Sequence, residues 1–253
     1  MMESSVQVTQ MFSSGMTRGM RSSLDVEYSP VGESFSMQEF WLYVCLRRVS
    51  VVAAHIISFG LAILTSILSR PGTSLFSWHP VCMSLGFGLC MTEGILLFSA
   101  EGSPLCFKSR KWKVRLHWFF QALLLVFGAT GFSFMVASKN VSEHSHFTSW
   151  HSLLGVGTMA ATVLQAICGI FLLFPTLIST QSFPRLRLYH RTCGLVAYLL
   201  ATITIMSAMF TDWFQATVKG TMWYIFLLLP LFPALVVMNQ ITNAFLPKKK
   251  ITS

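Results

Sequence analysis

The sequence predicts an all-α protein, a six-helix transmembrane bundle with a four-helix core formed by its second to fifth helices. Hydrophobic residues make up 53% of the 253-residue chain and charged residues only 11%, whereas soluble domains carry about 25% charged residues. A bilayer core roughly 30 Å thick needs about 20 apolar residues per helix. Six runs of about this length are present, at residues 49–69, 79–99, 116–137, 150–174, 189–210 and 222–245.

Turn-forming residues separate these runs, which supports six separate helices. Arg70-Pro71-Gly72 follows the first run and Gly102-Ser103-Pro104 follows the second. Pro230 and Pro233 fall inside the sixth run and predict a kink there. The runs are too long and too continuously apolar for the strands of a membrane barrel.

The two ends of the chain differ in composition from the apolar region. The first part is rich in Ser, Met and Gln and has no apolar stretch long enough for a signal peptide. We predict a disordered cytosolic tail at residues 1–45, a transmembrane domain at residues 46–247 and a basic cytosolic tail at residues 248–253.

The positive charges predict how the helices cross the membrane. The formal net charge is +9, but the basic residues fall in short gaps between apolar runs, so we expect a lipid bilayer as partner and no nucleic acid. Fifteen of the 18 Lys and Arg residues lie on one side, and only Arg70, Lys139 and Lys219 lie on the other. The positive-inside rule then predicts a multi-pass protein with both termini in the cytosol.

Four histidines are the strongest functional signal. They lie near the starts of the second to fifth runs, at His79, His117, His151 and His190. Successive helices run in opposite directions, so His79 and His151 share the non-cytosolic depth while His117 and His190 share the cytosolic depth. An ionisable residue within a membrane helix is a functional candidate by default.

Matched depth suggests what the histidines bind. A haem iron in a helical bundle takes axial ligands from facing helices, and the only depth-matched pairs among the four are His79/His151 and His117/His190. Two b-type haems with two histidine ligands each would use all four residues, which makes the core a haem-binding one. Such ligation leaves no open iron position and favours electron transfer across the membrane.

The histidine pattern resembles that of the cytochrome b561 family of transmembrane ascorbate-dependent reductases. Three motifs resemble its short "domain-containing" branch: SLFSWHP at 74–80, LYHRTCG at 188–194 and MNQ at 238–240. The resemblance implies an oxidoreductase that moves electrons from cytosolic ascorbate to monodehydroascorbate or ferric iron on the non-cytosolic side. Many members carry Ser-Leu-His-Ser-Trp around the fourth-helix histidine, where this chain has Ser-Trp-His-Ser-Leu.

The implied substrates suggest two further sets of residues. Ascorbate is an anion at neutral pH, so cations beside the cytosolic histidines are donor-site candidates: Lys113, Arg115, Arg185 and Arg187. On the other side, a short loop before His151 carries the acceptor-site candidates Glu143, His144 and His146, because carboxylate and imidazole groups suit transition metals.

Other intramembrane polar residues have weaker interpretations. We expect His55, on the first helix, to make a structural hydrogen bond. Glu93, Gln121 and Gln165 are predicted to bond between helices, with orientation of a ligand imidazole as the alternative.

Two other functions explain intramembrane histidines: a histidine-lined proton or transition-metal transporter, and a haem anchor subunit of a larger redox complex. The sequence also leaves open whether the membrane is an endomembrane (endoplasmic reticulum, vesicle or lysosome) or the plasma membrane, and whether the chain forms a homodimer.

Overall fold

The computed structural model describes residues 33–99, 109–177 and 182–243. All regular elements in these ranges are helical, which confirms the all-α prediction. They are α2 (Glu33–Ser69), α3 (Trp78–Met83), the π-helix η1 (Ser84–Cys90), α4 (Met91–Leu96), α5 (Arg110–Val141), α6 (Trp150–Leu173), the 3-10 turn η2 (Pro175–Leu177), α7 (Phe183–Ala208), α8 (Asp212–Thr217), α9 (Thr221–Leu228) and α10 (Leu231–Asn243).

Among the described residues, five helical segments are long and apolar enough to cross a membrane. They correspond to the first and the third to sixth predicted runs, with α9 and α10 together making one crossing. The second predicted run is helical from Trp78 to Leu96, but its middle third is the π-helix η1. A π-helix widens the helix locally and often occurs at functional sites.

Helix ends follow the local sequence chemistry. At the start of α6, Ser149 accepts a hydrogen bond from the backbone N–H of Ser152, and the Ser152 side chain returns the bond to the Ser149 backbone; this capping box satisfies two N–H groups that have no partner within the helix. The helix is interrupted at Pro230, where a kink was predicted: α9 ends at Leu228 and α10 begins at Leu231. Proline cannot donate the backbone bond that would join them.

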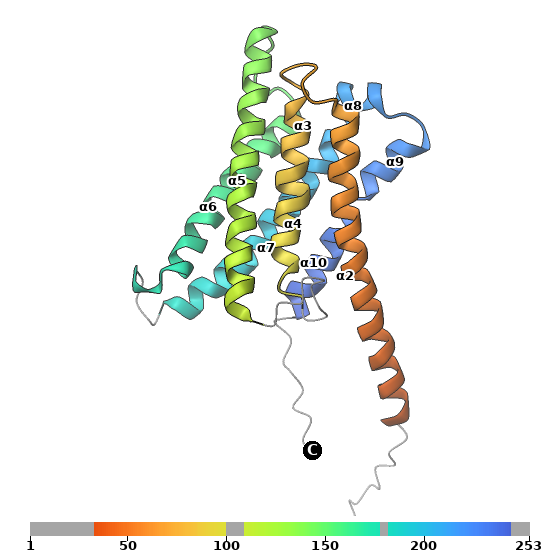
Figure 1. The fold of residues 1–253 in the computed structure, drawn as a ribbon, viewed down its shortest axis with the longest axis vertical. Coiled ribbons are helices and arrows are strands. Elements are labelled where there is room, and N and C mark those ends of the chain that lie inside the picture. The colour runs from red at the N-terminus through yellow and green to blue at the C-terminus, as the bar shows by residue number, and fades with distance from the viewer. Residues whose placement is uncertain (1–32, 100–108, 178–181, 244–253) are drawn as a thin grey trace, which may run out of the picture. The chain divides into compact units, whose positions relative to one another are not determined.

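Residues Val44–Ser253 form one compact unit, and two helix pairs dominate its packing. In Figure 1, α5 (green) runs beside α3 and α4 (yellow), and α6 and α7 (teal and cyan) run beside each other. The last helix, α10, packs against α7 and α4. Glycine allows a close approach within the first pair, since a Cβ atom at Gly86 of η1 would lie 3.3 Å from the Cβ of Phe127 on α5.

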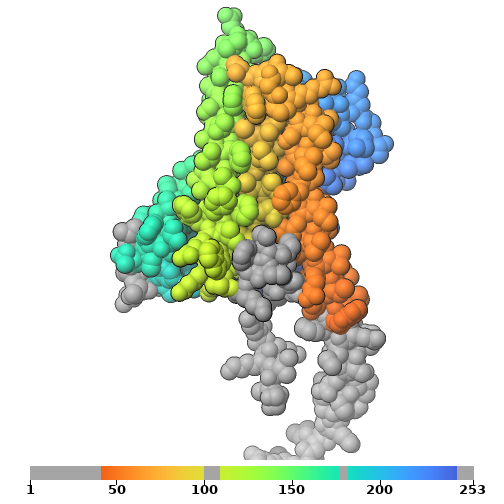
Figure 2. Space-filling view, viewed as in Figure 1, coloured from red at the N-terminus to blue at the C-terminus, as the bar shows by residue number. Residues whose placement is uncertain are grey.

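The core lies where these helices meet, and apolar side chains also cover the outside. Ala54, Leu124, Tyr198 and Val237 are buried together in one cluster drawn from α2, α5, α7 and α10. Helices α5 and α2, which form much of the face in Figure 2, expose large apolar side chains such as Val126, 60% exposed. An apolar exterior of this kind suits a protein solvated by lipid.

The predicted tails are tested little by the structure. Helix α2 begins at Glu33 and therefore includes the last residues of the segment predicted as a tail. Residues 1–32 and 248–253 lie outside the described residues.

Candidate functional site

The four histidines lie in two facing pairs. The ring centres of His79 on α3 and His151 on α6 are 6.3 Å apart, with the ring planes at 83°. The ring centres of His117 on α5 and His190 on α7 are also 6.3 Å apart, with the planes at 88°. These are the two pairs that the sequence predicts. Following the predicted orientation, we call His79 and His151 the outer pair and His117 and His190 the inner pair.

In three of these histidines, a backbone carbonyl group determines which ring nitrogen carries the proton. The Nδ1 atom lies 3.0 Å from the Gly131 carbonyl oxygen in His79, 2.8 Å from that of Gly94 in His117, and 3.1 Å from that of Thr204 in His151. A carbonyl oxygen can only accept, so Nδ1 carries the proton and donates it. In a neutral imidazole this leaves the lone pair on Nε2, the nitrogen then free to bind a metal.

The fourth histidine, His190, is held by a side-chain amide instead. In the orientation that satisfies its surroundings, the Gln165 amide nitrogen lies 2.9 Å from Nδ1 of His190 and 3.2 Å from the His190 carbonyl oxygen, and its oxygen accepts from the N–H of Gly194 at 3.1 Å. Nδ1 of His190 therefore accepts from the Gln165 amide, which in a neutral imidazole places the ring proton on Nε2, unlike the other three histidines. Gln165 therefore determines which nitrogen of His190 carries the proton.

His79 and His117 lie on the first helix pair, α3/α4 with α5, and His151 and His190 lie on the second, α6 with α7. The outer and the inner histidine pair each take one histidine from each helix pair. His79 and His117 bond to groups on α5 and α4, their neighbours in the first helix pair. His151 and His190 contact α7 and α6 in the same reciprocal way. The two rings of each histidine pair thus approach from opposite sides.

Glycine makes the first helix pair close enough for these bonds. A Cβ atom at Gly131 would lie 2.8 Å from the Cβ of Cys82, and one at Gly94 would lie 2.8 Å from the Gln121 amide nitrogen. Contacts this short require the neighbours to move, so a side chain at either glycine would push away a carbonyl that holds a histidine.

The spacing of the rings suits two ligands on one metal. A metal–imidazole bond of about 2 Å on each side, plus roughly 1 Å from each nitrogen to its ring centre, gives a separation of about 6 Å between the ring centres. Both pairs measure 6.3 Å. The described residues contain no group of three His, Cys, Asp or Glu that could hold a metal ion.

The sequence model of the family described as "Eukaryotic cytochrome b561" matches residues 78–215. This stretch contains all four histidines. The chain belongs to the cytochrome b561 family.

Individual relatives agree with this assignment. The chain is 53% identical over 206 residues to the mouse protein "Probable transmembrane reductase CYB561D1", covering 81% of this chain and 90% of that protein. It is 42% identical over 213 residues to the Bos taurus "Transmembrane reductase CYB561D2", covering 84% and 96%. It is 30% identical over 130 residues to "Probable ascorbate-specific transmembrane electron transporter 1" of Oryza sativa subsp. japonica, covering 51% and 54%. The resemblance to the "domain-containing" branch is thus confirmed.

Membership gives the broad character of the protein. It is a multi-pass membrane oxidoreductase related to ascorbate-specific transmembrane electron transporters, and the family implies b-type haem as cofactor.

Aromatic rings flank both histidine pairs. The Phe76 ring lies 6.2 Å from His79 at the outer pair, and the Phe98 ring lies 5.4 Å from His117 at the inner pair. Phe76 also contacts Trp213 of α8, with ring centres 5.5 Å apart. The sequence did not predict α8, a six-residue helix between the fifth and sixth runs.

The four cations proposed for the donor site lie on the helix starts that carry the inner pair. Lys113 and Arg115 are in the first two turns of α5, and Arg185 and Arg187 are in the first two turns of α7. Lys113 is half-buried and the three arginines are exposed. The Arg115 guanidinium lies 5.1 Å from the Trp112 ring and that of Arg187 lies 4.9 Å from the Phe183 ring, so aromatic contacts hold both near the helix surface.

The three residues proposed for the acceptor site do not converge on one point. Glu143, His144 and His146 are all exposed in the loop between α5 and α6. His144 Nδ1 lies 2.7 Å from the Ser142 carbonyl oxygen, and His146 Nε2 lies 2.8 Å from the Asn140 side-chain oxygen. Hydrogen bonds between nearby residues therefore determine the conformation of this loop, and the three side chains do not form a common binding site.

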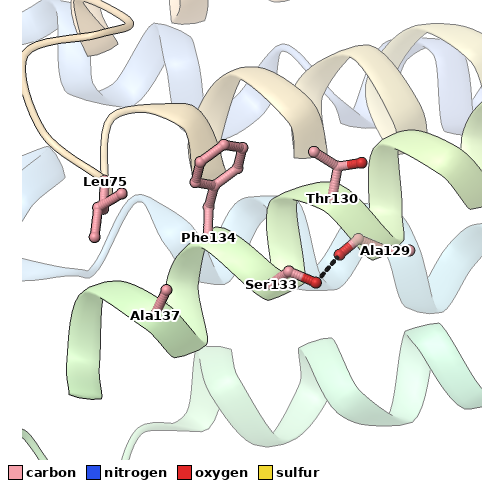
Figure 3. A pocket seen from close by; sticks show the side chains of 6 residues that line it. All are labelled: Leu75, Ala129, Thr130, Ser133, Phe134 and Ala137. Carbon is pink, nitrogen blue, oxygen red and sulfur yellow. Dashed lines mark hydrogen bonds between the residues drawn. The ribbon is translucent and has the colours of Figure 1, made fainter. Parts of the chain in front are cut away.

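A groove on the surface of α5 is separate from the histidine pairs. Figure 3 shows its lining residues, which include Leu75, Thr130 and Phe134. The Ser133 hydroxyl at its edge donates to the Ala129 carbonyl at 2.8 Å, so this polar group is already satisfied. None of the four histidines lines the groove.

Three of the polar intramembrane residues of uncertain role, His55, Glu93 and Gln165, have hydrogen-bond partners. Gln165 on α6 bonds to His190 and Gly194 on α7, which is the favoured interpretation, and the same side chain also contacts a candidate ligand imidazole. His55 makes the expected hydrogen bond, and its partner is Glu93 on α4. No spacing in the sequence indicates that pairing, because the two residues lie on helices whose rotation depends on packing.

Proposed function

We propose that this protein is a transmembrane oxidoreductase with two b-type haems, one held by the outer histidine pair and one by the inner pair. It would carry electrons from cytosolic ascorbate to monodehydroascorbate or ferric iron on the other side. The observation that carries the proposal is the matched geometry of the pairs, with ring centres 6.3 Å apart in both.

The protein's part is to hold four neutral imidazoles in fixed orientations. The carbonyl groups of Gly131, Gly94 and Thr204 accept hydrogen bonds from Nδ1 of His79, His117 and His151, which leaves each Nε2 lone pair available to a metal. Gln165 instead contacts His190 Nδ1 through its amide nitrogen, so the amide would have to turn for His190 to bind a metal through Nε2. Bound haem supplies reversible one-electron chemistry. With two protein ligands on each iron, electron transfer is favoured over oxygen binding.

Charge supports the direction of transfer. The excess of Lys and Arg beside the inner pair favours a cytosolic location for that side. Lys113, Arg115, Arg185 and Arg187 would then attract anionic ascorbate to the cytosolic surface. Both termini would lie in the cytosol.

The acceptor end rests on chemistry alone. Glu143, His144 and His146 offer oxygen and nitrogen donors that ferric iron accepts. Because they are exposed and do not converge, we propose that they engage the acceptor transiently at the surface beside the outer pair.

A reduced-minus-oxidised absorption spectrum of the purified protein, with a haem count, tests the proposal. We expect low-spin b-type haem at two per chain, reduced by ascorbate. A colourless preparation that still moves protons or metal ions would instead establish the transporter alternative. A preparation with haem that ascorbate cannot reduce without a partner subunit would establish the anchor-subunit alternative.

A further inference from the structure

A buried pair of ionisable side chains, which includes none of the four candidate histidine ligands, lies between α2 and α4. His55 Nδ1 is 2.6 Å from Glu93 Oε2, and the two residues are only 8% and 7% exposed. The second polar atom of each, His55 Nε2 and Glu93 Oε1, is buried and has no hydrogen-bond partner among the described residues. The pair therefore keeps one acceptor site unused on the imidazole.

A structural role alone does not explain this arrangement. Burying ionisable groups is costly, and a buried ion pair adds little stability compared with apolar packing. The neighbouring Thr92 joins α4 to Tyr198 of α7 through hydroxyl groups 3.0 Å apart, which shows that a neutral bond can connect helices in this layer. Because each residue has one buried polar atom without a hydrogen-bond partner, the His55–Glu93 pair stabilises helix packing less than a neutral hydrogen-bonded pair would.

The pair lies next to the group that orients the inner pair. Glu93 directly precedes Gly94 in the sequence, and the Gly94 carbonyl oxygen accepts a hydrogen bond from His117 Nδ1 at 2.8 Å. The other titratable groups that face Glu93 are Cys90, one turn earlier in the same segment, and Tyr198 on α7. A change of charge at the inner pair thus occurs close to Glu93 and within the low-dielectric interior.

We propose that the His55–Glu93 pair takes up one proton, at His55 Nε2, when the centre held by the inner pair gains an electron, and releases it when the electron leaves. This inference rests on the proposed function. Before uptake, a neutral imidazole and a carboxylate carry a net charge of −1; afterwards, an imidazolium and a carboxylate carry none. The electron comes from the donor, and the proton comes from the donor's hydroxyl group or from water on that side.

Charge balance is the physical reason. A ferric porphyrin with two neutral axial ligands has a core charge of +1, and its ferrous form has none, so the pair and the core together stay neutral in both states. Without the proton, reduction would leave an uncompensated carboxylate in a medium where charges interact strongly.

The wild-type protein gives the first test. Potentiometric titrations of the haem absorbance at several pH values between about 6 and 8, where histidine titrates, should show one of the two steps falling in potential as pH rises. The slope should approach ~59 mV per pH unit, the potential equivalent of a tenfold change in a one-electron equilibrium. The other step serves as the internal control and should change much less. An indicator dye should record one proton taken up with that electron.

Two variants identify the group that takes up the proton. Glu93→Gln keeps a hydrogen-bond acceptor for His55, and His55→Gln removes the imidazole; each should abolish most of the slope while both haems stay bound. Thr92→Val, which breaks the neighbouring neutral bond, is the matched control and should keep the wild-type slope. Infrared difference spectra of the reduced and oxidised protein should show an imidazolium signal that His55→Gln removes.

The outcomes separate the two proposals. Two haems with no pH-dependent step and no proton uptake in the wild-type protein would overturn this inference and leave the proposed function standing. A slope that survives in both Glu93→Gln and His55→Gln would overturn it as well. Absence of haem from the folded protein would overturn the proposed function first.

Discussion

The outer and inner histidine pairs have equal ring spacing but different support. Both outer histidines donate to backbone carbonyl oxygens, those of Gly131 and Thr204, and the second also lies 3.1 Å from the Ser207 hydroxyl. In the inner pair one ring bonds to a carbonyl and the other contacts the Gln165 amide. A side-chain substitution does not remove a backbone carbonyl group, so the hydrogen bonds of Nδ1 in the outer pair persist in variants. In the inner pair, one substitution at Gln165 removes the partner of His190 Nδ1.

The difference suggests that the two histidine pairs have different roles in electron transfer. The inner pair has an adjustable partner and the buried His55–Glu93 pair beside it, so its electron affinity can respond to protons. The outer pair has redundant, fixed partners, which suit a centre that passes the electron on.

Removal of a ligand should have the largest effect. We expect His79→Ala and His151→Ala each to lose the same haem, and His117→Ala and His190→Ala each to lose the other, so that the haem count falls from two per chain to one. Spectra of the four variants should form two identical groups. If His79→Ala and His117→Ala removed the same haem, the division into outer and inner pairs would be wrong.

Replacing the side chains that contact Nδ1 should distinguish the pairs next. Gln165→Leu removes the only side chain assigned to His190 Nδ1, and loss of such a partner typically weakens a metal site roughly 10- to 100-fold. Ser207→Ala is the matched control, because the Thr204 carbonyl remains for His151. Haem titration of the apoprotein measures both affinities, and equal losses would contradict the distinction.

Replacing each of the two close-packed glycines by alanine should lower the stability of the protein by different amounts. Gly131→Ala brings its Cβ atom to 2.8 Å from the Cβ of Cys82, which is attached directly to the backbone. The comparable contact of Gly94→Ala is with the end of the flexible Gln121 side chain. Overpacking should therefore cost about 1 kcal/mol or more at Gly131 and less at Gly94. Thermal unfolding in detergent, followed by haem absorbance, would show the reverse order if the inner side were packed more rigidly.

The smallest effect should come from the surface cations near the inner pair. Arg185→Ala or Arg187→Ala should raise the KM for ascorbate by up to roughly fivefold, the scale of one exposed charge interaction, and should do so less at high salt. Lys219→Ala, an exposed cation on the opposite predicted side, is the control. An unchanged KM in all the donor-side variants would remove these residues from the donor site.

Much of the fold follows from the sequence, because a membrane helix must be long, continuously apolar and bonded within itself. That rule located the runs containing α5, α6 and α7, and the interruption near Pro230. It did not foresee the π-helix at Ser84–Cys90, since a π-turn and an α-turn accommodate the same apolar residues and the choice depends on packing against α5.

The site divides in the same way. The sequence by itself determined which histidines face each other, because alternating helix directions assign each residue a depth. Only the tertiary structure decided what holds them: the carbonyl groups of Gly94, Gly131 and Thr204 carry no signature in the sequence, since every residue has one. The pairing of His55 with Glu93 was also settled by packing, because depth is fixed by distance along a helix, whereas contact between two helices depends on their rotation and spacing.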